Sequence, residues 1–189
     1  MKKRIDETHQ EHEMNSVEAA LGGMMKVKII DDRLKEWGFG RATMGSAAYD
    51  LRACIDSMMI LEPGNTAMIP TGIAIQLPTY QAAMLLPRSG LGANNGIVLA
   101  NLVGLIDSDY RGEVKAALWN RGHAQYAIKP GDRIAQMVVV VIGAYTMEIV
   151  EDLDETDRGD GGFGSSGIDR QGACSQPLSI RASNSRDAT

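Results

Sequence analysis

Two segments of the chain carry side chains that could act on a phosphorus centre, one around Asp107 and one around Arg88. A carboxylate such as Asp107, within hydrogen-bond reach of a water, can act as the general base for attack on phosphorus. The guanidinium of Arg88, the hydroxyl of Ser89 and free backbone N–H groups at a helix start can bind phosphate. A structural interpretation stays open for each segment. Asp107 could lie in the turn of a hairpin between strands at 102–106 and 113–120, and Ser89 could cap a short helical turn.

Asp50 and Gln136 lie in two further stretches that read as strands. A lone aspartate at position 50 could be structural and paired with Arg52. Gln136 could be a polar residue at the end of an edge strand. Residue type alone therefore gives neither side chain a role in chemistry.

A glycine-rich stretch at residues 158–167 contains the pattern G-x-G-x-x-G. A dinucleotide-binding fold needs a strand before this pattern and a helix after it, whereas here an acidic stretch precedes it and a polar tail follows, which excludes that fold. A flexible linker is the plain alternative, but Arg158 and Phe163 bracket the glycines. Phe163 can stack on a base, Arg158 can reach a phosphate, and glycines let the backbone wrap closely over a ligand.

These stretches belong to a set of five segments with a fixed order and spacing. The five are AAYDL (47–51), PRSGLG (87–92), GLIDSDYRG (104–112), GDRIAQ (131–136) and RGDGGFGSSG (158–167). Together they closely resemble the motifs of the trimeric deoxyuridine triphosphatase (dUTPase) family, and the resemblance runs from about Met25 to Gly167.

The resemblance implies an all-β fold, a jelly-roll-like barrel or sandwich with a flexible C-terminal arm. It implies Mg²⁺-dependent hydrolysis of dUTP to dUMP and pyrophosphate, which removes dUTP and supplies dUMP for thymidylate synthesis. It also implies a homotrimer whose three sites are shared between subunits. The base-reading segment would come from one chain, the phosphate-binding segments from a second and the arm from a third.

The resemblance also implies the site residues. Asp107 would activate the attacking water, Tyr110 would select deoxyribose, and Asp50 would act through water on a Mg²⁺ ion held mainly by the triphosphate. The substrate-binding positions would be Arg88, Ser89, Gly90, Asn101, Leu105, Ile106, Tyr110, Lys115, Gln136, Arg158, Phe163, Ser165 and Ser166. Ala48 stands where the family usually has glycine. If that glycine has a positive φ, alanine would cost stability or shift Asp50.

The elements expected to position these residues are short strands separated by Gly, Pro, Asn and Asp, as in a jelly roll. They are expected at 24–30, 66–69, 72–77, 82–86, 97–100, 113–120, 126–128, 133–141 and 145–150. The run at 133–141 is apolar on both faces from Met137 onward, which predicts burial on both sides.

Composition limits the partners. The 189 residues carry a formal net charge of −5, which disfavours general nucleic-acid binding because that binding depends on phosphate neutralisation. Any basic groups that bind an anion must therefore be concentrated locally. Cys54 and Cys174 show no disulfide or zinc pattern, which suits a cytoplasmic protein. No apolar run is long enough to span a bilayer, so we expect no membrane partner.

Four regions are expected along the chain: a polar extension at 1–23, a β domain at 24–150, the glycine-rich arm at 151–167 and a polar tail at 168–189. We expect the extension to be disordered or to precede the true start of translation. A short helix is possible at Ser16–Leu21.

Two other functions are weighed against hydrolysis of dUTP. A dCTP deaminase of the same fold would need a glutamate beside the base-reading segment, and none is convincing. A catalytically idle regulator would have no chemical need for Asp107, Tyr110, Arg158 and Phe163 together.

Overall fold

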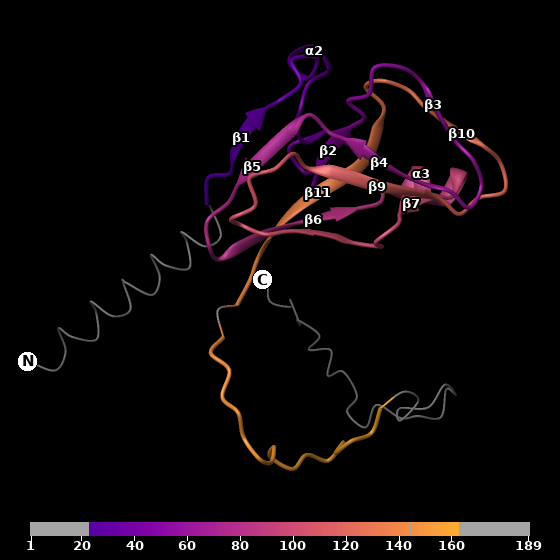
Figure 1. Cartoon of the computed structure of the whole chain (residues 1–189). Helices are drawn as coiled ribbons and strands as arrows, with labels where there is room; N and C mark the ends of the chain where they lie inside the picture. Colours follow the sequence, from indigo (N-terminus) through magenta and orange to yellow (C-terminus); the bar gives the residue numbers. More distant parts are fainter. Residues whose placement is uncertain (1–22, 144, 163–189) are drawn as a thin grey trace, which may run out of the picture. The chain divides into compact units, whose positions relative to one another are not determined.

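The computed structural model describes residues 23–143 and 145–162 (Figure 1). The chain divides into two units, Met1–Tyr145 and Thr146–Thr189. The possible helix at Ser16–Leu21 and the predicted site residues Phe163, Ser165 and Ser166 lie outside the described residues. The four regional boundaries drawn from the sequence stay predictions.

The first unit consists mainly of short strands, which confirms the all-β prediction. The strands are β1 (Lys26–Ile29), β2 (Tyr49–Arg52), β3 (Met59–Leu61), β4 (Thr66–Pro70), β5 (Ile73–Gln76), β6 (Gln81–Leu86), β7 (Ile97–Leu99), β8 (Gly104–Ile106), β9 (Lys115–Asn120), β10 (Tyr126–Ile128) and β11 (Arg133–Val141). The helices described are short, α2 (Leu34–Trp37) and α3 (Ser89–Asn95). In the described part of the chain no helix has the length and apolar character needed to cross a bilayer.

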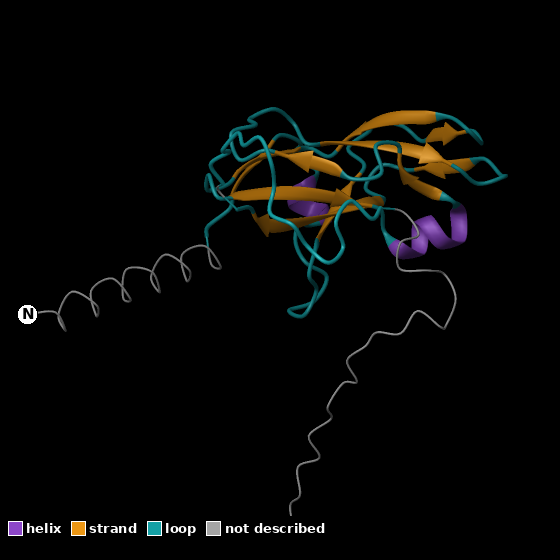
Figure 2. Cartoon of the chain, turned by 90° about the horizontal axis from the view of Figure 1, so that it is seen from below, coloured by secondary structure: helices purple, strands orange, loops and turns teal. Residues whose placement is uncertain are grey.

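The strands pair in an antiparallel manner. The largest sheet has the order β2-β11-β6-β8, a second has the order β4-β9-β7, and β1-β5 and β10-β3 form two-stranded sheets. Figure 2 shows that these strands make up most of the body of the unit. Leu51, Ile69, Ile75 and Ile128 come one from each sheet and belong to the same buried cluster. The four sheets therefore share one hydrophobic core, which fixes the strand ends that carry the candidate site.

Strand β9 shows how period-two alternation places residues in this core. Ala116, Leu118 and Asn120 are buried, whereas Lys115 is exposed. Asn120 is the polar member of this buried face. Its Nδ2 donates to the carbonyl oxygens of Leu61 and Ala124, both at 2.8 Å, and its Oδ1 accepts from the N–H of Gly122 at 2.9 Å.

The hairpin considered for strands 102–106 and 113–120 is wrong. Strand β8 pairs with β6, whereas β9 pairs with β4 and β7, so residues 107–114 cross from one sheet to another. The backbone at Gly104 lies close against β6, because a Cβ there would be 3.1 Å from the Cβ of Leu85. At the other end, buried Val114 donates its N–H to the carbonyl of Ile73 at 2.8 Å. These two anchors hold β8 and β9 apart.

The stretch that begins the second unit also differs from expectation. The strand expected at 145–150 is absent, since the described residues there have no regular structure. Ile149 is 99% exposed, so this chain alone offers that stretch no core to alternate against. In β11, Met137 is buried, but Val138, Val139 and Val140 are only half-buried and Val141 is exposed. The predicted burial on both sides is therefore incomplete in a single chain.

Candidate functional site

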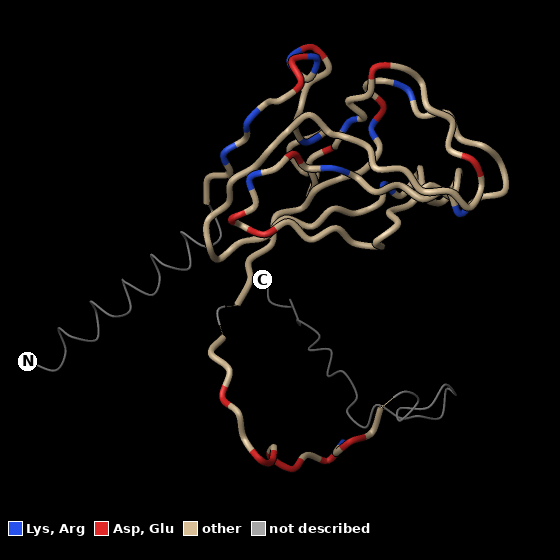
Figure 3. Tube along the Cα trace, viewed as in Figure 1, with Lys and Arg blue, Asp and Glu red and all other residues tan. Residues whose placement is uncertain are grey.

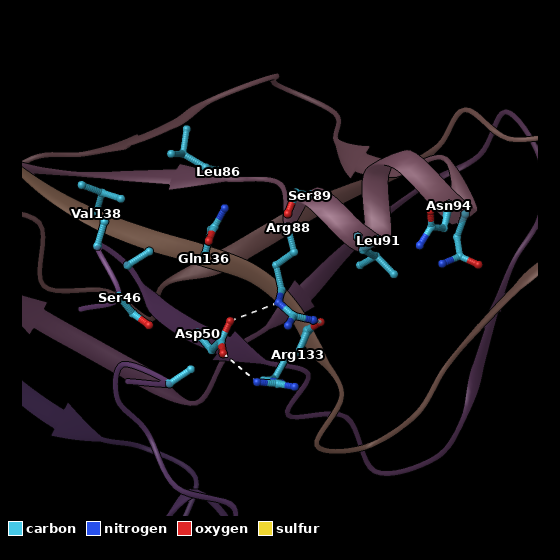
Figure 4. A pocket seen from close by; sticks show the side chains of 15 residues that line it. Ser46, Asp50, Leu86, Arg88, Ser89, Leu91, Asn94, Arg133, Gln136 and Val138 are labelled. Atoms are coloured by element: carbon cyan, nitrogen blue, oxygen red, sulfur yellow. Dashed lines mark hydrogen bonds and ion pairs between the residues drawn. The ribbon is translucent and has the colours of Figure 1, made fainter. Parts of the chain in front are cut away.

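Three of the five sequence segments meet at one cavity of about 730 Å³ (Figure 4). Asp50 comes from β2, Arg88 and Ser89 follow β6, and Gln136 comes from β11. The register explains the meeting, because Gln136 lies opposite Asp50 on one side and opposite Leu86 on the other. The full lining is Ala42, Ser46, Ala47, Ala48, Asp50, Leu86, Arg88, Ser89, Gly90, Leu91, Asn94, Asn95, Arg133, Gln136 and Val138.

The carboxylate of Asp50 pairs with two arginines. Arg88 Nε donates to Oδ1 and Arg133 Nη1 donates to Oδ2, each at 3.1 Å. The pairing with Arg52 considered from the sequence is wrong. Arg52 donates instead to the carbonyls of Gly38 and Gly131, at 3.0 and 2.8 Å. Asp50 thus holds two guanidinium groups at the cavity. In a chain of net negative charge, an anion site needs such a local concentration of basic groups.

Arg133 is a charged residue of the cavity that the sequence did not reveal. In a regular strand, residues three apart such as Arg133 and Gln136 point to opposite faces. Here the register shifts between Arg133 and Ala135, where Arg133 lies opposite Arg52 and Ala135 opposite Leu51. The bulge inserts Ile134 and reverses the alternation, so both polar residues reach the cavity. Asn94, Asn95 and Ser46 were also missed, because nothing in their local pattern marks them.

Helix α3 begins beside the cavity with Arg88 at its N-cap position, in an extended conformation and without a side-chain cap. The interpretation of Ser89 as the cap is therefore wrong. Ser89 is the first helical residue, and it is exposed at the cavity together with Gly90. The first N–H groups of a helix have no partner within the helix. The segment thus offers a hydroxyl and backbone donors to the cavity, as predicted.

Gln136 fixes the segment that leads into α3. Its Nε2 donates to the carbonyl of Pro87 at 2.9 Å. Gln136 does not end an edge strand, because β11 pairs there with β2 and β6. Ala48 has an ordinary backbone, since Leu102 is the sole non-glycine with positive φ among the described residues. The substitution of the usual glycine at position 48 therefore causes no backbone strain.

The residues predicted to activate water and to bind the nucleoside are not among those that line the cavity. Asp107 follows β8 and is exposed, and none of the described residues bonds to its carboxylate. Tyr110 Oη donates to the carbonyl of Glu113 at 3.1 Å, and a Cβ on residue 112 would overlap the Tyr110 ring. The remaining positions are exposed Asn101, Leu105 and Lys115 and half-buried Ile106.

One chain keeps Asp107 far from Arg88. Ile106, just before Asp107, lies opposite Ala83 near the start of β6, whereas Arg88 follows the end of the same strand. The stretch from residue 83 to residue 88 spans roughly 17 Å at the rise of an extended strand. A general base must lie within hydrogen-bond reach of the water that it activates. Asp107 and Arg88 of the same chain therefore lie too far apart for both to contact one phosphorus.

The described part of the second unit contains Arg158. Its Nε donates to the carbonyl of Gly161 at 3.0 Å, and the N–H of Gly161 donates to the carbonyl of Arg158 at 3.1 Å. The surrounding residues are mostly acidic from Glu148 to Asp160 (Figure 3). No helix or strand is present in residues 146–162.

The donors at the cavity fit Mg²⁺ bound together with a polyphosphate. Asp50 is the one carboxylate among the lining residues, and the described residues hold no group of three or more His, Cys, Asp or Glu suited to a metal ion. Mg²⁺ keeps several waters and commonly takes one or two carboxylates plus substrate phosphates. The described residues therefore supply one carboxylate to the cavity rather than a metal cage.

Away from the cavity, Asp31 and Cys54 are among the groups whose pKa values are shifted. The Arg33 guanidinium, hydrogen-bonded to Asp31, lowers the pKa of that carboxyl. Burial raises the pKa of the Cys54 thiol to about 11. A thiol with such a pKa is protonated and unreactive at neutral pH. Cys54 therefore serves as a buried residue of the hydrophobic core.

Comparison with known proteins adds to this geometry. The dUTPase family model matches residues 38–167. The deoxyuridine 5'-triphosphate nucleotidohydrolase of Neisseria meningitidis serogroup C is 54% identical over 145 residues, which cover 76% of this chain and 96% of that protein. The protein of the same description from Idiomarina loihiensis is 55% identical over 151 residues, covering 76% and 97%.

A solved structure shows the same fold. A dUTPase variant of Staphylococcus bacteriophage 80alpha, solved with dUpNHpp, matches with a TM-score of 0.70 and 25% sequence identity, covering 78% of this chain and 100% of the phage chain. The family model spans more than half of the present chain, and the bacterial relatives cover three quarters of it at more than 50% identity. The chain therefore belongs to the dUTPase family.

Proposed function

We propose that this chain hydrolyses dUTP to dUMP and pyrophosphate and that the cavity at Asp50 binds the triphosphate. The observation that carries the proposal is the meeting of three distant segments around two guanidinium groups and one carboxylate. The two bacterial relatives are named for this activity, and the phage dUTPase was solved with dUpNHpp. A small, mildly acidic protein that gathers arginines at one hollow is suited to a small polyanionic substrate.

Arg88, Ser89 and Gly90 bind the phosphates in this proposal. Arg88 can present two parallel N–H donors to phosphate oxygens, and phosphate contacts of this kind are stronger than neutral hydrogen bonds. Gln136 positions the segment through Pro87, and its amide also faces the cavity.

Mg²⁺, when bound, supplies positive charge that offsets the charge developing on the phosphate oxygens. Asp50 contributes the carboxylate of the cavity and acts through a water of the ion, which leaves direct ligation to the triphosphate.

The hydrolytic step uses Asp107. Water attacks the α-phosphorus in line, its proton passes to the Asp107 carboxylate, and pyrophosphate leaves. Backbone groups and side chains at Asn101, Leu105, Ile106 and Lys115 read uracil. The Tyr110 ring, held by its bond to the Glu113 carbonyl, packs under the sugar and leaves no room for a 2′-hydroxyl.

The complete site lies between copies of the chain, and the assembly is a homotrimer. The distance of roughly 17 Å along β6 between the two halves of the site supports this proposal. The apolar surface that a single chain leaves exposed or half-buried on Leu105, Val138 and Val141 gives further support. Burying such surface between subunits is favourable.

The arm completes the site from a third copy. Arg158 contacts the γ-phosphate, Phe163 stacks on the base, and Ser165 and Ser166 add hydrogen bonds. Closure of such a segment excludes water and aligns the phosphates. We place the protein in the cytoplasm, where the buried Cys54 thiol stays reduced.

The experiment that tests the function is product analysis with dUTP, UTP, dCTP and dTTP, each with and without Mg²⁺. Formation of dUMP and pyrophosphate from dUTP alone supports the proposal. Conversion of dCTP to dUTP or dUMP would show a deaminase, and no turnover of any nucleotide would show an idle member of the family.

A further inference from the structure

Arg133 has the position and the unused donors of a ligand-binding residue. Its side chain is 44% exposed at the cavity, and within the described residues its guanidinium makes one hydrogen bond, from Nη1 to Asp50. A guanidinium carries five N–H donors in a planar fork. Most of that donor capacity is therefore available to a ligand.

The two arginines are coupled to one another as well as to Asp50. Arg88 Nη1 donates to the backbone carbonyl of Arg133 at 3.0 Å, while both guanidinium groups bind the same carboxylate. Figure 4 shows the two side chains approaching Asp50 from two segments, Arg88 from the start of α3 and Arg133 from β11. A change in the charge at Asp50 acts on both at once.

We propose that Arg133 is a further phosphate-binding residue of this cavity and that Asp50 holds it, together with Arg88, until a divalent cation takes up the carboxylate charge. This inference rests on the proposed function for the identity of the anion, a polyphosphate. Without a cation, an incoming phosphate must compete with the Asp50 carboxylate for both guanidinium groups and approach a like charge. With a cation beside Asp50, the repulsion is cancelled and both forks turn to the phosphate oxygens.

The surroundings give Arg133 room to change partners. Arg133 and Asp50 also line a second, smaller hollow of about 250 Å³, which lies next to Arg41 and Arg52. Arg52 is held there by the carbonyls of Gly38 and Gly131, so it stabilises the bulge rather than binding ligand. The bulge then aims Arg133 into the space shared by both hollows.

The test is calorimetric binding of inorganic pyrophosphate to the full-length protein in the absence of divalent cations. Asp50→Asn removes the competing charge and keeps the shape, so we expect binding at least tenfold tighter than in the unchanged protein. Adding Arg133→Gln to Asp50→Asn should remove most of that gain. Arg121→Gln, which removes an arginine whose side chain lies outside this cavity, serves as the matched control and should change little.

The two proteins should differ in their response to Mg²⁺. Mg²⁺ should tighten pyrophosphate binding by the unchanged protein more than by Asp50→Asn. Arg133→Lys, which keeps the charge but loses the fork, should recover only part of the affinity lost in Arg133→Gln. Thermal unfolding of each variant shows whether a loss of binding is a loss of fold.

Two results would overturn the inference. One is Asp50→Asn binding cation-free pyrophosphate no more tightly than the unchanged protein. The other is Arg133→Gln, folded and with Asp50→Asn, keeping the whole gain. Failure of the proposed function looks different: the binding pattern would hold while dUTP is not hydrolysed.

Discussion

Mixed assemblies provide a strong test of a site shared between copies of the chain. Arg88→Gln removes a phosphate contact at the cavity, and Asp107→Asn removes the base, and each variant alone should lose nearly all turnover. The two positions lie roughly 17 Å or more apart in one chain, so an active site must combine Arg88 of one copy with Asp107 of another. A mixed assembly can therefore contain sites in which both residues are intact.

The recovered activity can be calculated from random mixing. In an equal mixture, half of the copies supply an intact cavity and half supply an intact base. The chance that a given site receives both is about one quarter, so co-expression should restore about one quarter of the unchanged activity per site in a closed symmetric assembly. Steady-state hydrolysis of dUTP by the co-purified mixture measures this fraction.

The controls use the double variant, which carries both Arg88→Gln and Asp107→Asn. It is mixed once with the Arg88→Gln variant and once with the Asp107→Asn variant. A double variant supplies neither intact half, so its mixtures with either single variant should recover nothing. Activity of the first mixture that stays at the level of its parents, although mixed assemblies are shown to form, would refute the shared site.

The remaining predictions concern single positions. Asp107→Asn should lower kcat by about 10²–10⁴-fold and leave binding of a non-hydrolysable dUTP analogue largely unchanged; a comparable kcat would remove Asp107 from its role. Asn120→Ala should destabilise the fold by about 3 kcal/mol, because this buried side chain loses three hydrogen bonds, and urea unfolding showing less than about 1 kcal/mol would contradict the account of β9. The pKa of Asp31 is lowered in the folded protein, so its contribution to stability is present above the pKa of the unfolded chain and is lost as the pH falls through the folded pKa. Asp31→Asn should therefore reduce the free energy of unfolding at pH 7 and have progressively less effect as the pH falls through the folded pKa, which acid-dependent urea unfolding measures.

The sequence predicted strands well where an apolar run lies between clear turn residues. The stretches at 126–128 and 133–141 match β10 and β11 residue for residue. Local patterns failed where tertiary pairing decides. Residues 113–120 continue an apolar pattern that suits a hairpin with 102–106, but the core anchor at Val114 and the close approach at Gly104 direct the two strands into different sheets.

The sequence predicted the segments that form the candidate site, but it did not predict which side chains contact one another there. Asp50, Arg88 and Gln136 were identified from the segments that contain them, and the structure brings these three together. Arg133 was missed because its direction depends on a bulge, which no alternation in the sequence signals. Its ion pair with Asp50 likewise depends on the register of β2 against β11, which is a property of the sheet.

The most direct measurement of the central claim is chromatographic separation of the products that the full-length protein forms from dUTP, UTP, dCTP and dTTP with Mg²⁺. The account predicts dUMP and pyrophosphate from dUTP and no comparable turnover of the other three nucleotides. Equal hydrolysis of UTP would contradict the role of Tyr110, and an unchanged dUTP pool would contradict the proposed function itself.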